Sequence, residues 1–270
     1  MVGELVFVKL GGSVITDKAK PFTERKDVIN RLATEIHSSQ DSTGAKLIVG
    51  HGGGSYPHVP AERYKTHLGI VGEESRMGSA LVQDAASRLN RIVVNALLTA
   101  GEPAISVQPS SSALARDSRI IEWRLEAVKL MLSSGLLPVP YGDVGVDLDK
   151  GFCILSTEEI FRFLAVQLKP SRVIIGSDVD GVYDSDPHHN PKATKRSLIT
   201  PNNVGLILKS LGAATTVDVT GGMRSKVLKL LELVQEVDDV ECEVLNLLVP
   251  GNLEDALNGE RGRGTIIRRT

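Results

Sequence analysis

Two short apolar runs that each lead into a cluster of glycines constrain the fold of this chain more than any other feature. Residues 5–8 (LVFV) are soon followed by Gly11 and Gly12, and residues 47–49 (LIV) by three successive glycines at 52–54. A continuous apolar run of this length is typical of a strand buried on both faces of a parallel sheet. Glycines after such strands permit sharp turns at the edge where α/β proteins bind ligands. The pattern predicts a parallel α/β fold with a ligand site at that edge.

The rest of the chain alternates between helical and strand-like patterns. Apolar residues recur at helical spacing in five segments, which are residues 27–37, 74–100, 122–134, 157–168 and 222–235. Strand-like runs occupy residues 105–107, 136–139, 172–175, 243–249 and 265–268, with a hairpin or loop at 142–155. The alternation predicts a mostly parallel sheet covered by helices on both faces. A chain of 270 residues has room for one large α/β domain or two smaller ones, and the polar loop 184–203 is a candidate boundary.

Charge and cysteine content exclude several classes of protein. The chain has 31 Lys and Arg against 33 Asp and Glu, a net charge of −2, which excludes a protein that coats nucleic acid but not a local cationic site. Cys153 and Cys242 lie far apart in the sequence and predict neither a zinc site nor a disulfide. There is no signal-peptide pattern, and no apolar stretch approaches the roughly 18 residues of a membrane-spanning helix. We therefore expect a cytoplasmic protein without a membrane or nucleic-acid partner.

The glycine clusters have lysines beside them, which favours phosphate binding. Lys9 precedes the first cluster and Lys18 follows it, within the segment KLGGSVITDK at residues 9–18. Consecutive glycines can point several backbone N–H groups at an anion, and two such loops after neighbouring strands would bracket two phosphates. The dinucleotide, Walker and protein-kinase signatures are absent from the sequence, so a phosphate-handling enzyme would use another scheme. The alternative is that each loop is only a tight strand-to-helix turn.

A third motif follows the predicted strand 172–175. It is the segment SDVDGVY at residues 177–183, which places Asp178 at the end of that strand. An aspartate in this position would orient lysines, hold the shell of a magnesium ion or contact a ribose. The alternative is an ordinary turn rich in Asp.

A fourth motif precedes the last long predicted helix. It is the segment DVTGGMRSK at residues 218–226, in which Asp218 or Thr220 would cap the helix. Its glycines would admit a nucleotide, and Lys226 would reach the phosphates from the first turn.

These four motifs together resemble the amino acid kinase superfamily. They occur in the order of that family and cover nearly the whole chain, as KLGGS at 9–13, HGGGS at 51–55, SDVDGVY at 177–183 and DVTGGMRSK at 218–226. His58, four residues after Gly54, makes the chain similar to the isopentenyl phosphate kinases within that family, although the fosfomycin-resistance kinases share this histidine. The resemblance implies an open three-layer αβα sandwich with a mostly parallel sheet, assembled as a homodimer. Residues 1–270 would form one domain, with an acceptor-binding and dimer half at about 1–170 and a nucleotide-binding half at about 171–270.

The resemblance also implies a reaction and a set of site residues. ATP and isopentenyl phosphate would give ADP and isopentenyl diphosphate, a step of isoprenoid biosynthesis in an alternative mevalonate route, with Mg²⁺ and without a protein metal ligand that we can name. The catalytic residues would be Lys9, Lys18 and His58. The substrate would contact Gly53, Gly54, His58 and Thr157. ATP would contact Lys9, Gly11, Gly12, Ser13, Gly54, Asp178, Gly222 and Lys226, and Glu158 would organise the lysines.

Two departures from the family's pattern bear on activity. Tyr56 and Pro57 stand where the family usually has Phe-Gly, so one loop N–H is lost and the approach to His58 is stiffened. Thr157 and Glu158 stand where the family usually has Gly-Asp. Thr157 would keep a backbone N–H contact with substrate if its φ is negative, and Glu158 would reach the lysines with one methylene more.

The chemistry of a phosphate acceptor fits the residues that are present. The second pKa of a phosphate monoester is about 6, so the nucleophile is already ionised near neutral pH and needs no strong general base. Catalysis of such a transfer is mainly positioning and electrostatic stabilisation, which lysines and glycine loops supply. We therefore expect His58 to donate a hydrogen bond to the acceptor phosphate. The alternatives are a related kinase with another acceptor, such as a fosfomycin-type kinase, and a non-catalytic nucleotide-binding homologue.

Overall fold

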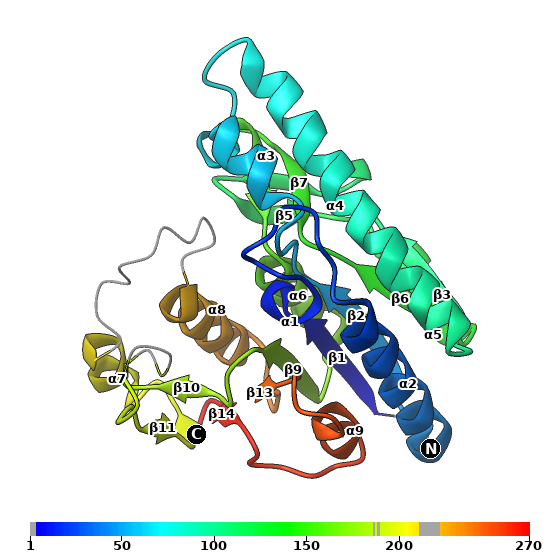
Figure 1. Ribbon diagram of the computed structural model, residues 1–270, viewed down its shortest axis with the longest axis vertical. Coiled ribbons are helices and arrows are strands. Elements are labelled where there is room, and N and C mark those ends of the chain that lie inside the picture. Colours follow the sequence, from blue (N-terminus) through cyan, green and yellow to red (C-terminus); the bar gives the residue numbers. More distant parts are fainter. Residues whose placement is uncertain (1–3, 186, 188–189, 211–221) are drawn as a thin grey trace.

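A central sheet organises the fold. The computed structural model describes residues 4–185, 187, 190–210 and 222–270 (Figure 1). Six strands lie side by side in the central sheet. Their spatial order is β12 (Leu198–Ile199), β14 (Thr265–Ile267), β13 (Glu241–Asn246), β9 (Arg172–Ser177), β1 (Leu5–Leu10) and β2 (Lys46–His51). Neighbouring strands run parallel, except that β13 and β14 are antiparallel. The mostly parallel sheet predicted from the sequence is confirmed.

A further parallel pair extends this sheet beyond β2. It consists of β3 (Ala104–Val107) and β6 (Leu137–Pro140). Strand β6 lies against β2, and His51 at the end of β2 forms a parallel bridge with Tyr141 just after β6. The carboxyl ends of β9, β1, β2 and β6 therefore lie along one edge.

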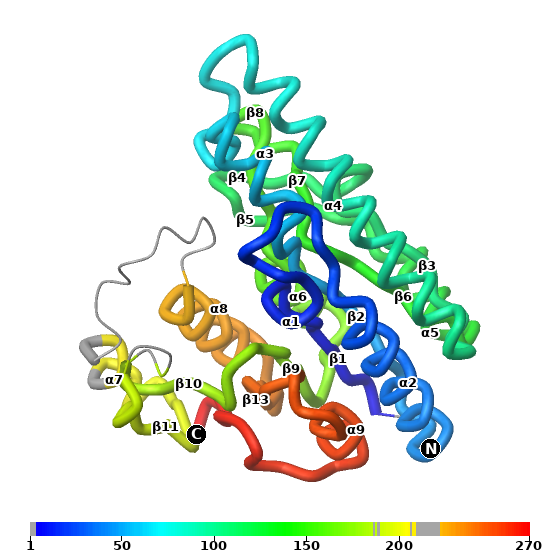
Figure 2. The backbone as a smooth tube through the Cα atoms, in the orientation of Figure 1, coloured from blue at the N-terminus to red at the C-terminus, as the bar shows by residue number. Residues whose placement is uncertain are grey.

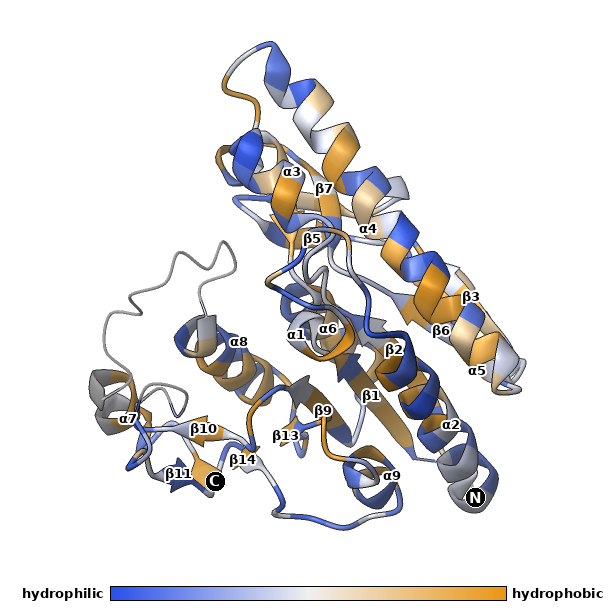
Figure 3. Ribbon diagram, in the orientation of Figure 1, coloured by the Kyte–Doolittle hydropathy of each residue, from blue (hydrophilic) through white to orange (hydrophobic). Residues whose placement is uncertain are grey.

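Helices cover both faces of the sheet, which gives the αβα arrangement (Figure 2). One face carries α5 (Glu126–Ser133), α6 (Thr157–Leu168) and α8 (Gly222–Glu236), and the other carries α2 (Lys26–Thr43), α4 (Glu74–Thr99) and α9 (Asn252–Leu257). The strands divide their side chains between two cores, since Phe7 packs with α6 whereas Val6 and Val8 pack with α2 and α4. Figure 3 shows β1 and β9 in largely hydrophobic colours between these layers.

Smaller elements stand at the carboxyl edge of the sheet. A four-stranded sheet in the order β5 (Arg119–Glu122), β4 (Leu114–Arg116), β7 (Asp143–Asp147) and β8 (Gly151–Leu155) lies there. Helix α3 (His58–Arg63) packs on α4 beside it. The remaining elements are α1 (Gly12–Ile15), η1 (Thr66–Leu68), η2 (Pro109–Ser111), β10 (Val182–Tyr183), β11 (Lys195–Arg196) and α7 (Val204–Ser210).

The structure corrects several predicted boundaries. The helix predicted at 122–134 begins only at Glu126, because residues 119–122 form a strand that pairs with β4 and buries Ile120. The strand predicted at 243–249 is Glu241–Asn246. The hairpin at 142–155 is confirmed as β7 and β8, whereas the polar loop 184–203 contains the short strands β11 and β12. Within the described part of the chain, no helix is long and apolar enough to cross a membrane.

Candidate active site

The two glycine loops touch one another at the carboxyl ends of β1 and β2. A Cβ added to Gly12 would lie 2.5 Å from the backbone nitrogen of Gly54, so neither loop leaves room for a side chain there. Thr16 joins the loops, because its Oγ1 donates to the Gly12 carbonyl oxygen (2.7 Å) and accepts from the Ser55 N–H (3.0 Å). Gly54 has φ +54°, a conformation that glycine adopts without strain. The loops that the sequence predicts to bind phosphates therefore form one continuous surface.

The loop after β9 meets this surface. A Cβ added to Gly11 would lie 2.3 Å from the carbonyl oxygen of Gly176, the residue before the last in β9. Ser13 then reaches across, and its Oγ donates to Asp178 Oδ1 at 3.0 Å. Three of the four predicted motifs are thus brought together by direct contact between their backbones or side chains.

Lysines and one buried carboxylate gather around the glycine loops. Lys9 and Glu158 are 7% and 9% exposed and form an ion pair between the end of β1 and the first turn of α6. Burial alone would raise the pKa of Glu158, but the positive charges of Lys9 and Lys226 and the hydrogen bond from Lys9 lower this pKa to about 2. Glu158 therefore carries its negative charge near neutral pH.

Lys226, in the first turns of α8, interacts electrostatically with both Lys9 and Glu158. Burial is the main cause that lowers the pKa of Lys226 to about 8, and repulsion from Lys9 and Lys18 adds to it, whereas Glu158 and Asp178 oppose it. Lys18 itself is exposed on the loop after α1. Three lysines thus share two carboxylates at the edge of the sheet, an excess of positive charge that suits a polyanionic ligand.

The HGGGS loop is held from behind by a buried network around His51. Burial lowers the pKa of His51 to about 4, so its ring is neutral. In that state its Nδ1–H donates to the Gly52 carbonyl oxygen (3.0 Å) and its Nε2 accepts from the Asn90 amide (3.1 Å). The ring also stacks on Tyr141, at 5.5 Å between centroids. The sequence alone does not predict this role for Asn90. Its one signal is that Asn90 is a lone amide in the apolar stripe of the helix predicted at 74–100.

Thr157 acts on the same loop through its side chain. It is the first residue of α6, so its φ is helical and negative, as the sequence argument requires for a backbone contact. Its hydroxyl is buried and donates to the His51 carbonyl oxygen at 2.7 Å. The glycine that usually occupies this position in the family cannot form that bond.

His58 is the half-buried first residue of α3. Pro57 stands before it and packs on the HGGGS loop, since a Cβ on Gly53 would lie 2.1 Å from Pro57 Cγ. The neighbouring Tyr56 donates its hydroxyl to Glu24 at 2.5 Å, and burial together with Glu24 raises the pKa of Tyr56. The Tyr-Pro departure thus tightens the turn that leads into α3.

The fourth motif is described only in part. Gly222 is the first residue of α8 and has φ +61°. The two cap candidates, Asp218 and Thr220, lie outside the described residues.

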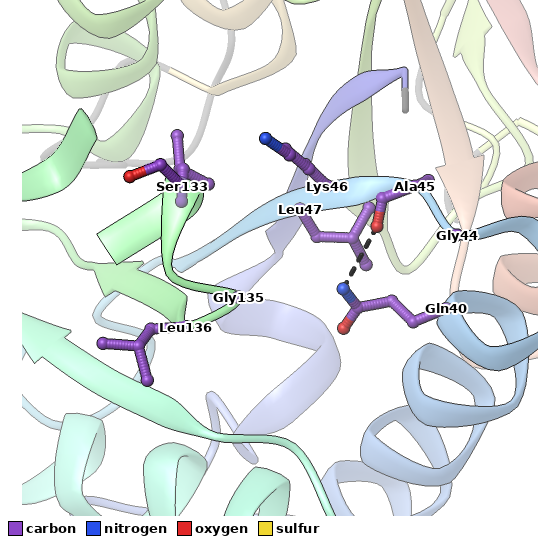
Figure 4. A pocket seen from close by; sticks show the side chains of 9 residues that line it. Gln40, Gly44, Ala45, Lys46, Leu47, Ser133, Gly135 and Leu136 are labelled. Atoms are coloured by element: carbon purple, nitrogen blue, oxygen red, sulfur yellow. Dashed lines mark hydrogen bonds between the residues drawn. The ribbon is translucent and has the colours of Figure 1, made fainter. Parts of the chain in front are cut away.

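A cavity of about 290 Å³ lies away from the site, near the start of β2 (Figure 4). Its lining includes Gln40, Lys46 and Leu136. The glycine loops follow the opposite end of β2.

Comparisons with known proteins agree with this geometry. A sequence model described as "Amino acid kinase family" matches residues 4–246. The isopentenyl phosphate kinase of Methanothermobacter thermautotrophicus is 40% identical over 97% of this chain and 98% of that protein. A structure described as "X-ray structures of isopentenyl phosphate kinase" superposes with a TM-score of 0.85 and 36% identity, covering 97% of this chain and 99% of the other. A product complex of the T. acidophilum isopentenyl phosphate kinase gives a TM-score of 0.77 and 27% identity, covering 98% and 100%.

The chain belongs to the amino acid kinase family. Within that family it groups with the isopentenyl phosphate kinases.

Proposed function

We propose that this chain transfers the γ-phosphoryl group of ATP to isopentenyl phosphate, giving isopentenyl diphosphate and ADP. The observation that carries the proposal is the meeting of the loops after β1, β2 and β9 around the Lys9–Glu158 pair, with Lys226 within electrostatic range. Two phosphorylated substrates need such a surface of backbone N–H groups and lysines. Relatives that carry the name isopentenyl phosphate kinase, and that match nearly the full length of the chain, support the choice of acceptor.

We assign the residues of the site the following roles. Gly11, Gly12, Ser13 and Gly54 offer backbone N–H donors to the phosphates of ATP, with Asp178, Gly222 and Lys226 on the nucleotide side. Lys9 and Lys18 stabilise the charge that spreads over the transferred group, and Glu158 orders the lysines by pairing with Lys9. Gly53, Gly54 and the Thr157 N–H bind the acceptor, and His58 donates a hydrogen bond to its phosphate.

We assign the isoprenoid tail to apolar side chains near His58. Ala61 of α3, Val82 of α4 and Val144 of β7 form a separate small core cluster with Ile154 packed against it. This cluster lies where α3, the helix that begins with His58, packs on α4. A five-carbon tail directed from His58 toward these side chains would leave water, whereas its phosphate stays at the loops.

The residues of the site also fit a magnesium ion. Mg²⁺ in kinase sites is held by one or two carboxylates and mainly by phosphates and water. Asp178 is the carboxylate that would share it, since it follows β9 and lies within hydrogen-bonding distance of Ser13 in the first glycine loop. When bound, the ion would neutralise charge on the ATP phosphates.

We also propose the assembly and location of the protein. Residues of about 1–170 form the acceptor-binding half and residues of about 171–270 the nucleotide-binding half of a single domain. Ile121, Val146 and Leu148 are 47, 53 and 51% exposed on the small sheet of the acceptor half, which is apolar surface that a homodimer would bury. Two unpaired, buried cysteines fit a reducing cytoplasm. Sedimentation velocity would distinguish a dimer from a monomer.

A coupled assay of ADP release tests the function. With ATP and Mg²⁺ present, we expect turnover with isopentenyl phosphate at least 100-fold faster, in kcat/KM, than with fosfomycin, acetylglutamate or UMP, a difference of about 2.7 kcal/mol. Faster turnover with fosfomycin would replace the proposal by a fosfomycin-type kinase. ATP binding without transfer to any acceptor would identify a non-catalytic nucleotide-binding protein.

A further inference from the structure

The first turn of α6 connects the two halves of the site. Glu158 pairs with Lys9, and Thr157 holds the HGGGS loop through the His51 carbonyl. Glu159 accepts from the Ile120 N–H (2.8 Å) and from the Arg162 guanidinium (2.7 Å), both within buried surroundings. Ser156 is the N-cap of the helix, and its Oγ accepts from the Glu159 N–H at 3.3 Å. Thr157, Glu158 and Glu159 therefore fix α6 to three different parts of the molecule, whereas the Ser156–Glu159 bond lies within α6 itself.

Ser156 has a second partner, which comes from α8. Lys229 Nζ donates to Ser156 Oγ at 2.8 Å, and Lys229 is half-buried between the two helices. The N-terminal end of a helix is its positive end, so a lysine there is unfavourable for helix stability taken alone. Glu158 and Glu159 in the first turn offset part of this cost. Helix stability alone does not account for a lysine at this position.

A second contact fixes the same face of α8 two turns later. Arg162 of α6 donates to Glu236 Oε2 at 2.7 Å, and Arg119 of β5 also pairs with Glu236. Lys229 and Glu236 are seven residues apart, which places them on one side of α8. Lys226 lies three residues before Lys229 on that side, and its charge acts on Glu158. The contacts of α8 with α6 thus hold the helical segment that carries Lys226.

We propose that Lys229 is a positioning residue for phosphoryl transfer: by binding the N-cap of α6, it fixes the first turns of α8 and holds Lys226 beside Glu158 and Lys9. Lys229 itself does not touch the substrates in this account. The role in transfer rests on the proposed function, whereas the effect on Lys226 can be measured without any substrate.

Three variants test the proposal by kinetics. Lys229→Met removes the ammonium and keeps the unbranched stem, Lys229→Arg keeps a cation, and Lys129→Met makes the same change at an exposed lysine of α5. Because a small displacement of a catalytic group costs up to about 100-fold, we expect Lys229→Met to lower kcat between about 10- and 100-fold. KM for isopentenyl phosphate should change less than about twofold, since the acceptor contacts remain. Lys229→Arg should recover most of the loss, and Lys129→Met should have no effect.

A titration of the substrate-free protein measures the pKa of Lys226. This pKa would not change in Lys229→Met if Lys229 had a purely structural role. The groups that act on Lys226 are Lys9 from β1, Lys18 from the loop after α1, Glu158 from α6 and Asp178 after β9. If Lys229→Met lets Lys226 move toward water, the pKa of Lys226 rises from about 8 toward its ordinary value of 10.5. NMR titration of ¹³Cε-labelled lysines, with Lys226→Met to assign the signal, measures this directly.

The outcomes separate this proposal from the function on which it rests. A wild-type protein that is inactive with isopentenyl phosphate, but whose Lys226 titration shifts upward in Lys229→Met, would refute the function and support the positioning. An unchanged Lys226 titration together with an unchanged kcat in Lys229→Met would overturn the positioning. Loss of kcat in proportion to lost folded protein, judged by circular dichroism, with an unshifted Lys226 signal, would overturn it as well.

Discussion

Glu158 is the residue on which the charge balance of the site depends. Among the residues that the structure describes, it is the carboxylate that pairs directly with Lys9, and its exposed fraction is 9%. Its longer side chain reaches Lys9 from the first turn of α6, so the departure from the family's usual aspartate keeps an ionised partner for the lysines. Desolvating such a pair is expensive, and removing one partner leaves the other charge buried and uncompensated.

Replacing Glu158 by Gln should therefore destabilise the protein. The free energy of unfolding at pH 7 should fall by about 3 kcal/mol, as measured by urea denaturation. In the wild type the folded pKa of Glu158 is about 2 against an ordinary 4.5, so its stabilisation is complete above pH 4.5 and disappears as the pH falls toward 2. Glu158→Gln should lack this acid-dependent component. The matched control is Glu62→Gln at an exposed position of α3, and an equal loss there would contradict the account.

Substitution of His58 tests the acceptor side of the site. A hydrogen bond to a charged phosphate contributes about 1.5–3 kcal/mol, so His58→Ala should lower kcat/KM for isopentenyl phosphate between about 10- and 100-fold. KM for ATP should stay nearly constant, because His58 is assigned to the acceptor. His67→Ala, at an exposed position in η1, serves as the control. Unchanged kinetics in His58→Ala would show that this assignment is wrong.

At the scale of elements, the end of β2 is fixed more firmly than its glycines suggest. His51 is 1% exposed, and its two ring nitrogens and its carbonyl bind Gly52, Asn90 and Thr157. These contacts hold the strand end against α4, α6 and β6, so the flexible glycines begin from a rigid base. A loop prepared in this way pays little conformational entropy when it binds a phosphate.

This arrangement predicts a second acid-dependent loss of stability. The folded pKa of His51 is about 4 against an ordinary 6.5, so below pH 6.5 the unfolded chain binds a proton that the folded chain does not. Stability is complete above pH 6.5 and should fall by about 3 kcal/mol as the pH drops to 4. Urea denaturation across this range, for the wild type and for His51→Asn, measures the difference. A wild-type slope that persists in His51→Asn would refute the assignment.

At the scale of the whole molecule, the sequence predicts the parallel sheet and the positions of the glycine loops, because both depend on local patterns. Residues 5–8 and 47–49 are apolar enough to identify buried strands, and glycines mark their ends. The sequence does not predict the short strand pairs β4–β5 and β10–β11, because these strands are stabilised by their pairing partners and do not show a periodic apolar pattern. Lys229 and Asn90 were also missed, because only the packing of α8 on α6 and of α4 on β2 gives them partners.

The sheet also predicts that the two halves do not fold separately. Strand β1 pairs with β2 on one side and with β9 on the other, and α8 covers α6. A fragment of residues 1–170 would expose the β9 side of β1 and the apolar face of α6. We expect this fragment to give a poorly dispersed NMR spectrum, and the full chain to unfold in one cooperative transition. A well-dispersed spectrum of the fragment would contradict this.

Direct identification of the product tests the central claim. The protein is incubated with ATP, Mg²⁺ and isopentenyl phosphate, and the mixture is followed by ³¹P NMR. The account predicts that the single phosphate signal of isopentenyl phosphate is replaced by the two coupled signals of a diphosphate, with one ADP formed for each. An unchanged isopentenyl phosphate signal, with ATP intact or merely hydrolysed to ADP and inorganic phosphate, would contradict it.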